Sequence, residues 1–263
     1  MIHLFRKIRQ QLLKNNRFKK YAFYALGEIV LVMVGILLAL QFSTWNKEKE
    51  NTKKEGWYLV NIVEDIEYQK SILKDMKIFC NESIETGKQI IEEYNRNKSF
   101  LEIDSLDQRL NSLMNSFTFP NTNNTYNELV SSGKFDLIQE KKLSLTIIEY
   151  FSFIRENNAN SNTDIINVFY PEIYPVYNQF SQVVLPNNSN KKPTIDKDIT
   201  LYIHDILQKP ASKLLLLNAI KTQILLLLDN IVVIDETLLF SKEVIQSIDD
   251  YLGLTSEMVN HFD

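Results

Sequence analysis

The sequence predicts an all-α protein in which one N-terminal transmembrane helix continues into an exported antiparallel helical bundle. Three observations predict this fold class. One long apolar stretch follows a basic leader, and apolar side chains recur at intervals of three and four residues along much of the remaining chain. Glycine and proline number only six each among 263 residues. Because these residues usually make up roughly 7% and 5% of a protein, we expect few turns and long helices.

The apolar stretch covers residues 21–45 and reads YAFYALGEIVLVMVGILLALQFSTW. A bilayer core about 30 Å thick requires about 20 mostly apolar residues in a spanning helix. Aromatic residues stand at both ends of the stretch, where they suit the headgroup level. We therefore expect a transmembrane signal anchor in contact with the lipid bilayer. A cleaved signal peptide is the alternative, but the basic leader is long and no pair of small residues stands at cleavage spacing.

Residues 1–20 carry seven lysines and arginines and no acidic residue, and they are more basic than the residues that follow the anchor. The positive-inside rule then places the N-terminus in the cytoplasm and residues 46–263 outside. Apolar leader residues fall at helical spacing, which predicts a basic amphipathic segment on an anionic leaflet; charges that only fix topology are the alternative. Nucleic acid is not an expected partner, because the chain has a net charge of -4 and its basic cluster adjoins the membrane.

Within the anchor, Glu28, Gly35 and Ala39 fall on one helical face. Gly35 and Ala39 form a small-xxx-small pair, which lets two helices approach closely. A carboxyl group in hydrocarbon needs a hydrogen-bonding partner or the nearby interface. These three residues are therefore a candidate membrane pairing face for a homodimer or for another membrane protein. The alternative is that Glu28 reaches the cytoplasmic headgroups.

Two segments resemble a known family. They are GEIVLVMVGILLALQFSTWNKE from Gly27 and TYNELVSSGKFDLIQEKKLSLTIIEYF from Thr125. Both are similar to domain of unknown function family 6090, a group of uncharacterised single-pass membrane proteins of Bacteroidota. The resemblance implies one anchor in a bacterial inner membrane and a helical periplasmic domain, and it implies no activity. Ser43 and Thr44 depart from the asparagine pair expected there, which leaves the anchor assignment intact.

Residues 46–263 are expected to form one helical domain, because they suffice for a sizeable core. Apolar periodicity and capping residues predict helices at 57–95, 105–116, 124–132, 139–156, from Asp164 onward, and 210–252. Gly133 and Gly253 are expected to stop two of them. Asparagine-rich residues 157–162 and residues 185–198 are expected to be loops. The last helix is the most apolar, but its recurring charges disfavour a second span and favour a central helix of the bundle.

One group of aromatic residues follows Asp164, near two prolines that kink or divide the helix. Tyrosine combines an apolar ring with a hydrogen-bonding hydroxyl, which suits a ligand pocket between helices. Core packing is the alternative. The candidate aromatic pocket consists of Phe169, Tyr170, Tyr174, Tyr177 and Phe180.

Motifs for chemistry are scarce. His3, His204 and His261 are far apart in the sequence, and they suggest no metal site. His204 is expected to be solvated beside Asp205, and Cys80 falls on an apolar stripe typical of a core. No catalytic residue and no cofactor is expected. Two classes of function remain: an extracytoplasmic binding, sensing or scaffolding protein anchored in the membrane, or a membrane-tethered hydrolase with an unrecognised site.

Overall fold

The computed structural model describes residues 18–183 and 196–260. Most of the basic amphipathic segment predicted in the leader therefore lies outside the described residues. His3 and His261 lie outside them as well. Every regular element in the described ranges is helical, which confirms the all-α prediction. The chain divides into two compact units, Met1–Trp57 and Tyr58–Asp263. The predicted boundaries after residues 20 and 45 fall inside one helix, α2 (Phe18–Asn97), and they remain predictions about the membrane.

The first unit contains the N-terminal part of α2. Its apolar side chains from Leu26 to Leu40 are exposed in the structure. By length and composition, α2 is the one helix among the described residues that could cross a membrane. This observation agrees with the predicted anchor, whereas the apolar C-terminal helix fails the same criterion, as the sequence predicted.

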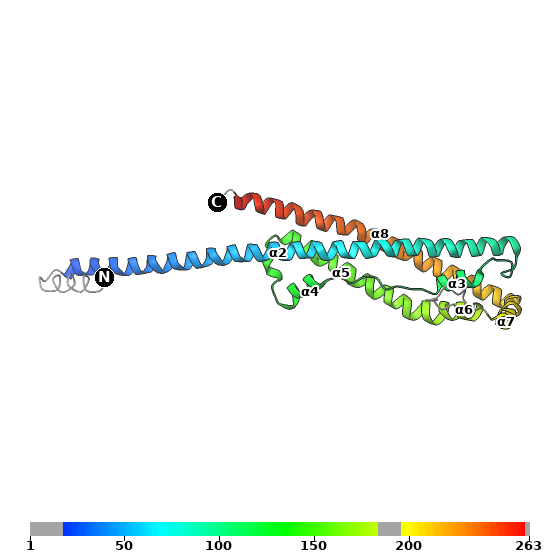
Figure 1. Ribbon diagram of the computed structural model, residues 1–263. Helices are drawn as coiled ribbons and strands as arrows, with labels where there is room; N and C mark the ends of the chain where they lie inside the picture. The colour runs from blue at the N-terminus through cyan, green and yellow to red at the C-terminus, as the bar shows by residue number, and fades with distance from the viewer. Residues whose placement is uncertain (1–17, 184–195, 261–263) are drawn as a thin grey trace. The chain divides into compact units, whose positions relative to one another are not determined.

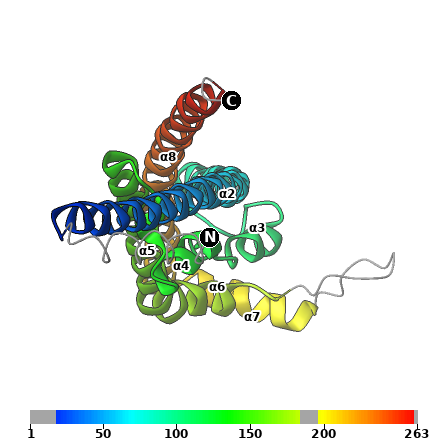
Figure 2. The same cartoon turned by 90° about the vertical axis from the view of Figure 1, so that its left-hand side faces the viewer.

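The second unit is a bundle built from the rest of α2, the C-terminal helix and shorter helices that pack beside them (Figure 1). In chain order these elements are α3 (Leu106–Leu113), α4 (Asn124–Ser131), the 3-10 turn η1 (Phe135–Leu137), α5 (Lys141–Asp164), the π-helix η2 (Ile165–Ile173), α6 (Tyr174–Phe180), α7 (Lys197–Leu207) and α8 (Pro210–Asn260). Helices α3, α6 and α7 gather at one end of the unit (Figure 1), and Figure 2 shows α6 and α7 side by side.

Two apolar clusters form the core of the second unit. One joins α2 to α4, α5 and the C-terminal half of α8, with Ile66, Leu129 and Ile147 among its fully buried side chains. The other joins the end of α2 to α3, η2, α6, α7 and the N-terminal half of α8, with Leu110 and Tyr177 at its centre. Side chains of the second cluster line both cavities described below, and side chains of the first cluster also line the smaller one.

The predicted stop of α4 at Gly133 is confirmed, and a side chain caps the start of α5. Gly133 adopts a left-handed conformation at φ +65° just after α4, as expected for a glycine stop. The Lys134 N–H donates to the Leu129 carbonyl, 3.0 Å away, and so closes the last turn. At the start of α5, the Glu140 carboxylate accepts a 2.8 Å hydrogen bond from the Leu143 N–H.

The structure corrects the predicted loop at residues 157–162 and the end of the loop predicted at residues 185–198, of which residues 185–195 lie outside the described ranges. Residues 157–162 are helical within α5, because Asn158 donates to the Phe119 carbonyl and Asn162 donates to Asn158. These contacts outweigh the modest helix propensity of asparagine. Lys197 and Asp198 belong to α7, which the sequence analysis did not predict, and Asp196 caps this helix by accepting from the Asp198 and Ile199 N–H groups.

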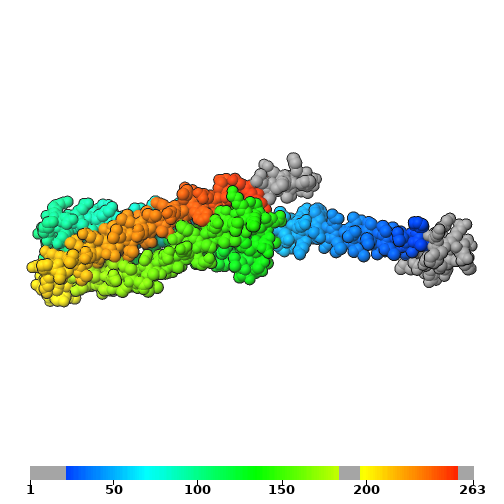
Figure 3. All heavy atoms as spheres, turned by 180° about the vertical axis from the view of Figure 1, so that it is seen from behind, coloured from blue at the N-terminus to red at the C-terminus, as the bar shows by residue number. Residues whose placement is uncertain are grey.

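Helix α8 also differs from its prediction. It continues through Gly253 to Asn260, so this glycine does not stop it. Figure 3 shows α8, in orange, at the surface of the second unit rather than surrounded by other helices. Its exposed apolar side chains are Leu214, Leu215, Leu225, Leu228, Val232 and Leu239.

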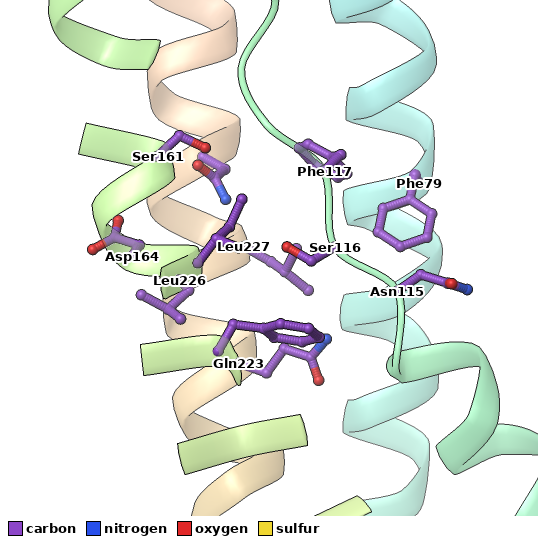
Figure 4. Close-up of a pocket in the computed structure, with 12 residues that line it drawn as sticks. Phe79, Asn115, Ser116, Phe117, Ser161, Asp164, Gln223, Leu226 and Leu227 are labelled. Carbon is purple, nitrogen blue, oxygen red and sulfur yellow. The ribbon is translucent and has the colours of Figure 1, made fainter. Parts of the chain in front are cut away.

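Residues 114–123, which we call the inner segment, have no regular secondary structure and pass between α2 and α8 (Figure 4). Buried backbone carbonyls need hydrogen-bond donors, and side chains supply them here. Gln69 of α2 donates to the Pro120 carbonyl over 2.9 Å, and Gln223 of α8 donates to the neighbouring Leu113 carbonyl over 2.7 Å. Both glutamines in turn accept hydrogen bonds from buried tyrosines, Tyr150 and Tyr177 respectively.

Candidate functional site

A small cavity lies at the centre of the second unit, beside the inner segment (Figure 4). Its walls include Phe79 of α2, Ser116, Asp164 and Gln223. Its volume is about 30 Å³, and a water molecule requires roughly 10–15 Å³ measured in this way. The central cavity therefore has the size and polarity of a site for one or two water molecules, and it is too small for an organic ligand.

A larger cavity lies where α3, α6 and α7 gather, and we call it the α3–α7 cavity. Its volume is about 270 Å³. Three parts of the chain form it: the connection between α2 and α3 with the first turn of α3, the last residue of α6, and one face of α7. The lining residues are Phe100, Leu101, Ile103, Ser105, Leu106, Asp107, Gln108, Phe180, Thr200, Ile203, His204 and Leu207.

The helical repeat of α7 explains its contribution. The α7 residues that line the cavity follow one another at steps of three, one and three positions, so they share one helical face. They are Thr200, Ile203, His204 and Leu207. Ile203 and Leu207 are buried, whereas Thr200 and His204 are partly exposed. The face therefore presents apolar groups to the interior and polar groups near the rim.

The first turn of α3 forms the opposite wall. Ser105 stands at the N-cap position with φ +54°, a left-handed conformation that is uncommon for residues other than glycine, and its side chain makes no capping hydrogen bond. Two residues later, the Asp107 carboxylate accepts a hydrogen bond from the Gln182 N–H over 3.3 Å. The wall thus carries one negative charge.

Gln182 joins the two walls. Its side-chain amide donates to the Thr200 hydroxyl over 2.9 Å. Its backbone carbonyl accepts a hydrogen bond from the Asn111 side chain of α3 over 2.8 Å. Its side-chain oxygen accepts from the Asp196 N–H at the cap of α7. These hydrogen bonds fix α3 and α7 on either side of the cavity, so the cavity is a formed feature of the fold.

The floor of the α3–α7 cavity is apolar. Phe100, Phe180 and Leu207 are each 1% exposed, and Ile103 and Ile203 are also buried. The polar groups of Ser105, Asp107, Gln108, Thr200 and His204 complete the lining. An apolar floor with a few polar groups is the usual composition of a small-molecule site.

The structure distributes the predicted aromatic pocket over different places. Phe169 lines the central cavity, and Phe180 lines the α3–α7 cavity. Tyr177 is buried, where desolvation raises the pKa of its hydroxyl. Tyr170 is 55% exposed, and its ring packs against Phe169 and Tyr174. The five side chains therefore do not line a single cavity.

The predicted pairing face lies on α2 in the first unit. Gly35 and Ala39 are exposed there, and a Cβ atom added to Gly35 would meet nothing within 4 Å. Glu28 is partly exposed. The structure of one chain leaves the small residues of this face open to a second helix.

Sequence reasoning missed His204 and Asp107 as site residues. It expected both His204 and Asp205 to be solvated; Asp205 is exposed, whereas His204 is only partly exposed and lines the cavity. The usable signal was the apolar and polar repeat from Thr200 to Leu207, which follows a good N-cap at Asp196. Over the described residues, no group of three histidine, cysteine or acidic side chains is placed to hold a metal ion.

Comparison with known proteins gives one match. The model of a family described as "Family of unknown function (DUF6090)" matches residues 28–159, which is half of the chain. No curated protein and no solved structure matches significantly. The matched range includes the apolar part of α2, the inner segment and most of α5. The chain therefore belongs to the DUF6090 family of unknown function.

Proposed function

We propose that this protein is a membrane-anchored module that binds a small molecule in the α3–α7 cavity. The observation that carries the proposal is a cavity of about 270 Å³ with a buried apolar floor and convergent polar side chains. Ligand pockets usually measure about 300–1,000 Å³, so this cavity suits a small ligand. The hydrogen bonds of Gln182 hold its walls without a ligand, which lowers the cost of ordering them on binding.

The proposed location is a bacterial inner membrane, with the N-terminus in the cytoplasm and residues 46–263 in the periplasm. The apolar stretch of α2 and the basic residues before it support this orientation. Glu28, Gly35 and Ala39 are the proposed surface for a homodimer or a membrane-protein partner. A periplasm-dependent reporter enzyme fused after residue 263 should be active, and the same fusion before residue 1 should not.

Methyl NMR on the full chain in detergent tests the binding proposal. Ile103 and Ile203 line the cavity, whereas Ile66 belongs to the other core cluster. In a screen of small cationic, anionic and neutral aromatic fragments, we expect saturable shifts of the Ile103 and Ile203 methyl signals without a shift at Ile66. If no fragment moves the two reporters, the cavity is not a binding site.

A hydrolase is the second candidate, because Ser105, Asp107 and His204 line the same cavity. Nucleophilic catalysis requires hydrogen-bond reach between the serine, the histidine and the acid. Among the described contacts, no hydrogen bond joins these three side chains, and Asp107 accepts from Gln182 instead. The arrangement therefore favours binding over hydrolysis.

A fluorophosphonate probe decides between the two candidates. Binding without hydrolysis predicts no labelling of Ser105, and a Ser105→Ala variant should give the same background as the native chain. Labelling that disappears in Ser105→Ala and persists in Ser112→Ala, a serine of α3 outside the cavity lining, would establish the hydrolase.

A further inference from the structure

We propose that the ligand of the α3–α7 cavity is a small organic cation, an amine whose apolar body rests on the aromatic floor. This inference depends on the proposed binding function, and it adds the chemical class of the ligand. Three features of the cavity lead to it: the sign of its charge, the free acceptor capacity of Asp107, and the two buried rings.

The charge of the lining is negative. Asp107 is a carboxylate, and none of the other lining residues is a lysine, an arginine or a second acid. His204 on α7 is the other titratable group among them. A ligand anion would have to approach Asp107 without an arginine or lysine to offset the repulsion, whereas an ammonium group would find an oppositely charged partner.

Asp107 retains acceptor capacity. A carboxylate offers about four lone-pair positions on two oxygens. Among the described contacts, Asp107 Oδ1 accepts one hydrogen bond, a long one of 3.3 Å from the Gln182 N–H, and Oδ2 accepts none. Helix α3 gains some stability from an acidic residue in its first turn, but that effect does not require Asp107 to line a cavity.

The floor suits the remainder of such a ligand. Phe100 comes from the connection after α2, Phe180 ends α6, and both are 1% exposed. These rings and the surrounding Ile103, Ile203 and Leu207 side chains give that part of the cavity an apolar lining. An arylalkylamine therefore matches both the wall and the floor of the cavity.

The test uses phenethylamine and the full chain in a zwitterionic detergent, with the Ile103 and Ile203 methyl signals as reporters and Ile66 as the internal control. We expect saturable shifts with phenethylamine. The neutral 2-phenylethanol and the anionic 3-phenylpropionate should bind at least about tenfold more weakly, because a hydrogen bond to a charged group contributes about 1.5–3 kcal/mol, and 1.4 kcal/mol corresponds to tenfold.

Two variants with the same change of charge locate the effect. Asp107→Asn should weaken phenethylamine binding about tenfold or more and leave 2-phenylethanol unchanged. Asp104→Asn should change neither, because the exposed Asp104 lines an open polar groove next to Arg109 and not the cavity. An unchanged Ile66 signal checks that each variant is folded.

The outcomes separate the two proposals. Equal or tighter binding of the alcohol or the anion at Ile103 and Ile203 overturns the cation class and leaves the binding function standing. Failure of all three probes and of the fragment screen overturns both. If Asp107→Asn does not fold, the comparison of the three probes on the native chain still decides the class.

Discussion

Two tyrosine–glutamine pairs illustrate how single side chains stabilise irregular backbone inside this helical bundle. Tyr150 donates to Gln69, which donates to the Pro120 carbonyl. In the same way, Tyr177 donates to Gln223, which donates to the Leu113 carbonyl. All four side chains are buried. Since a buried polar atom without a partner costs about 1–3 kcal/mol, each pair must remain complete.

We therefore expect Tyr150→Phe to lower the free energy of unfolding by about 1–3 kcal/mol, because it leaves the Gln69 oxygen without its donor. Urea denaturation followed by circular dichroism measures the loss. Tyr68→Phe is the matched control, because Tyr68 is 61% exposed. Equal stability of the native chain and Tyr150→Phe would contradict the importance of this hydrogen bond.

Cys80 gives the protein a pH dependence. Burial raises the pKa of its thiol to about 12, whereas a thiol in an unfolded chain titrates near about 8.5. Above that pH the unfolded state loses a proton that the native state keeps, so stability is complete below about pH 8.5 and falls as the pH rises toward 12. Burial also raises the pKa values of Tyr150 and Tyr177, which adds to the loss above about pH 10.

The Cys80 contribution is isolated by comparison with Cys80→Ala. Between about pH 8.5 and 10, the unfolding free energy of the native chain should fall by up to about 1.4 kcal/mol per pH unit, and that of the variant should stay nearly constant. Denaturation curves at several pH values measure both slopes. Parallel slopes would show that Cys80 is not the titrating group.

At the scale of helices, α2 and α8 approach closely at Gly87. A Cβ atom added to this glycine would lie 3.0 Å from Ile224 Cδ1 and 3.2 Å from Ile220 Cγ2, which is tighter than ordinary contact. Glycine lowers the helix propensity of α2 there, and close packing against α8 accounts for its presence.

Gly87→Leu should destabilise the bundle by about 1–3 kcal/mol or more, since overpacking forces side chains or backbone to move. Gly253→Ala is the matched helical control, because a Cβ at this position of α8 would meet nothing within 4 Å. We expect it to raise stability by about 0.5–1 kcal/mol. Thermal unfolding of both variants tests the pair, and a neutral Gly87→Leu would contradict the close approach.

The sequence predicted most helices because their apolar repeats match the buried faces, as in α5 with Leu143 and Ile147. It could not predict the side-chain contacts that keep residues 157–162 helical. It predicted a disturbance at Pro171, and the structure shows a π-helix in which the Tyr174 N–H donates to the Phe169 carbonyl five residues earlier. Proline has no N–H to continue the α-helical ladder, but the form of the disturbance depends on packing.

The candidate site was less predictable than the fold. Phe180 was expected near a pocket and does line one, but Tyr170 is exposed. Asp107 and His204 are almost a hundred positions apart in the sequence, and only the packing of α3 and α7 through Gln182 brings them to one cavity. Contacts of this kind have no local signal.

At the scale of the whole molecule, the pairing of anchors is testable in membranes. Gly35→Ile should remove most of a crosslinked dimer, because a larger side chain prevents close approach of two helices. Glu28→Gln should weaken it as well. Leu37→Ile on the opposite helical face is the control. A dimer unaffected by Gly35→Ile, or a native chain that crosslinks neither to itself nor to another protein, would contradict the pairing face.

The inner segment also bears on how fast the chain folds. Its partners are remote in sequence: Gln69 lies 51 positions from Pro120, and Gln223 lies 110 positions from Leu113. Segments this far apart in the sequence must come together before either hydrogen bond can form. The chain therefore loses conformational entropy before it gains the energy of the hydrogen bonds. We therefore expect these two hydrogen bonds to form after the local helices, as a late and slow step of refolding.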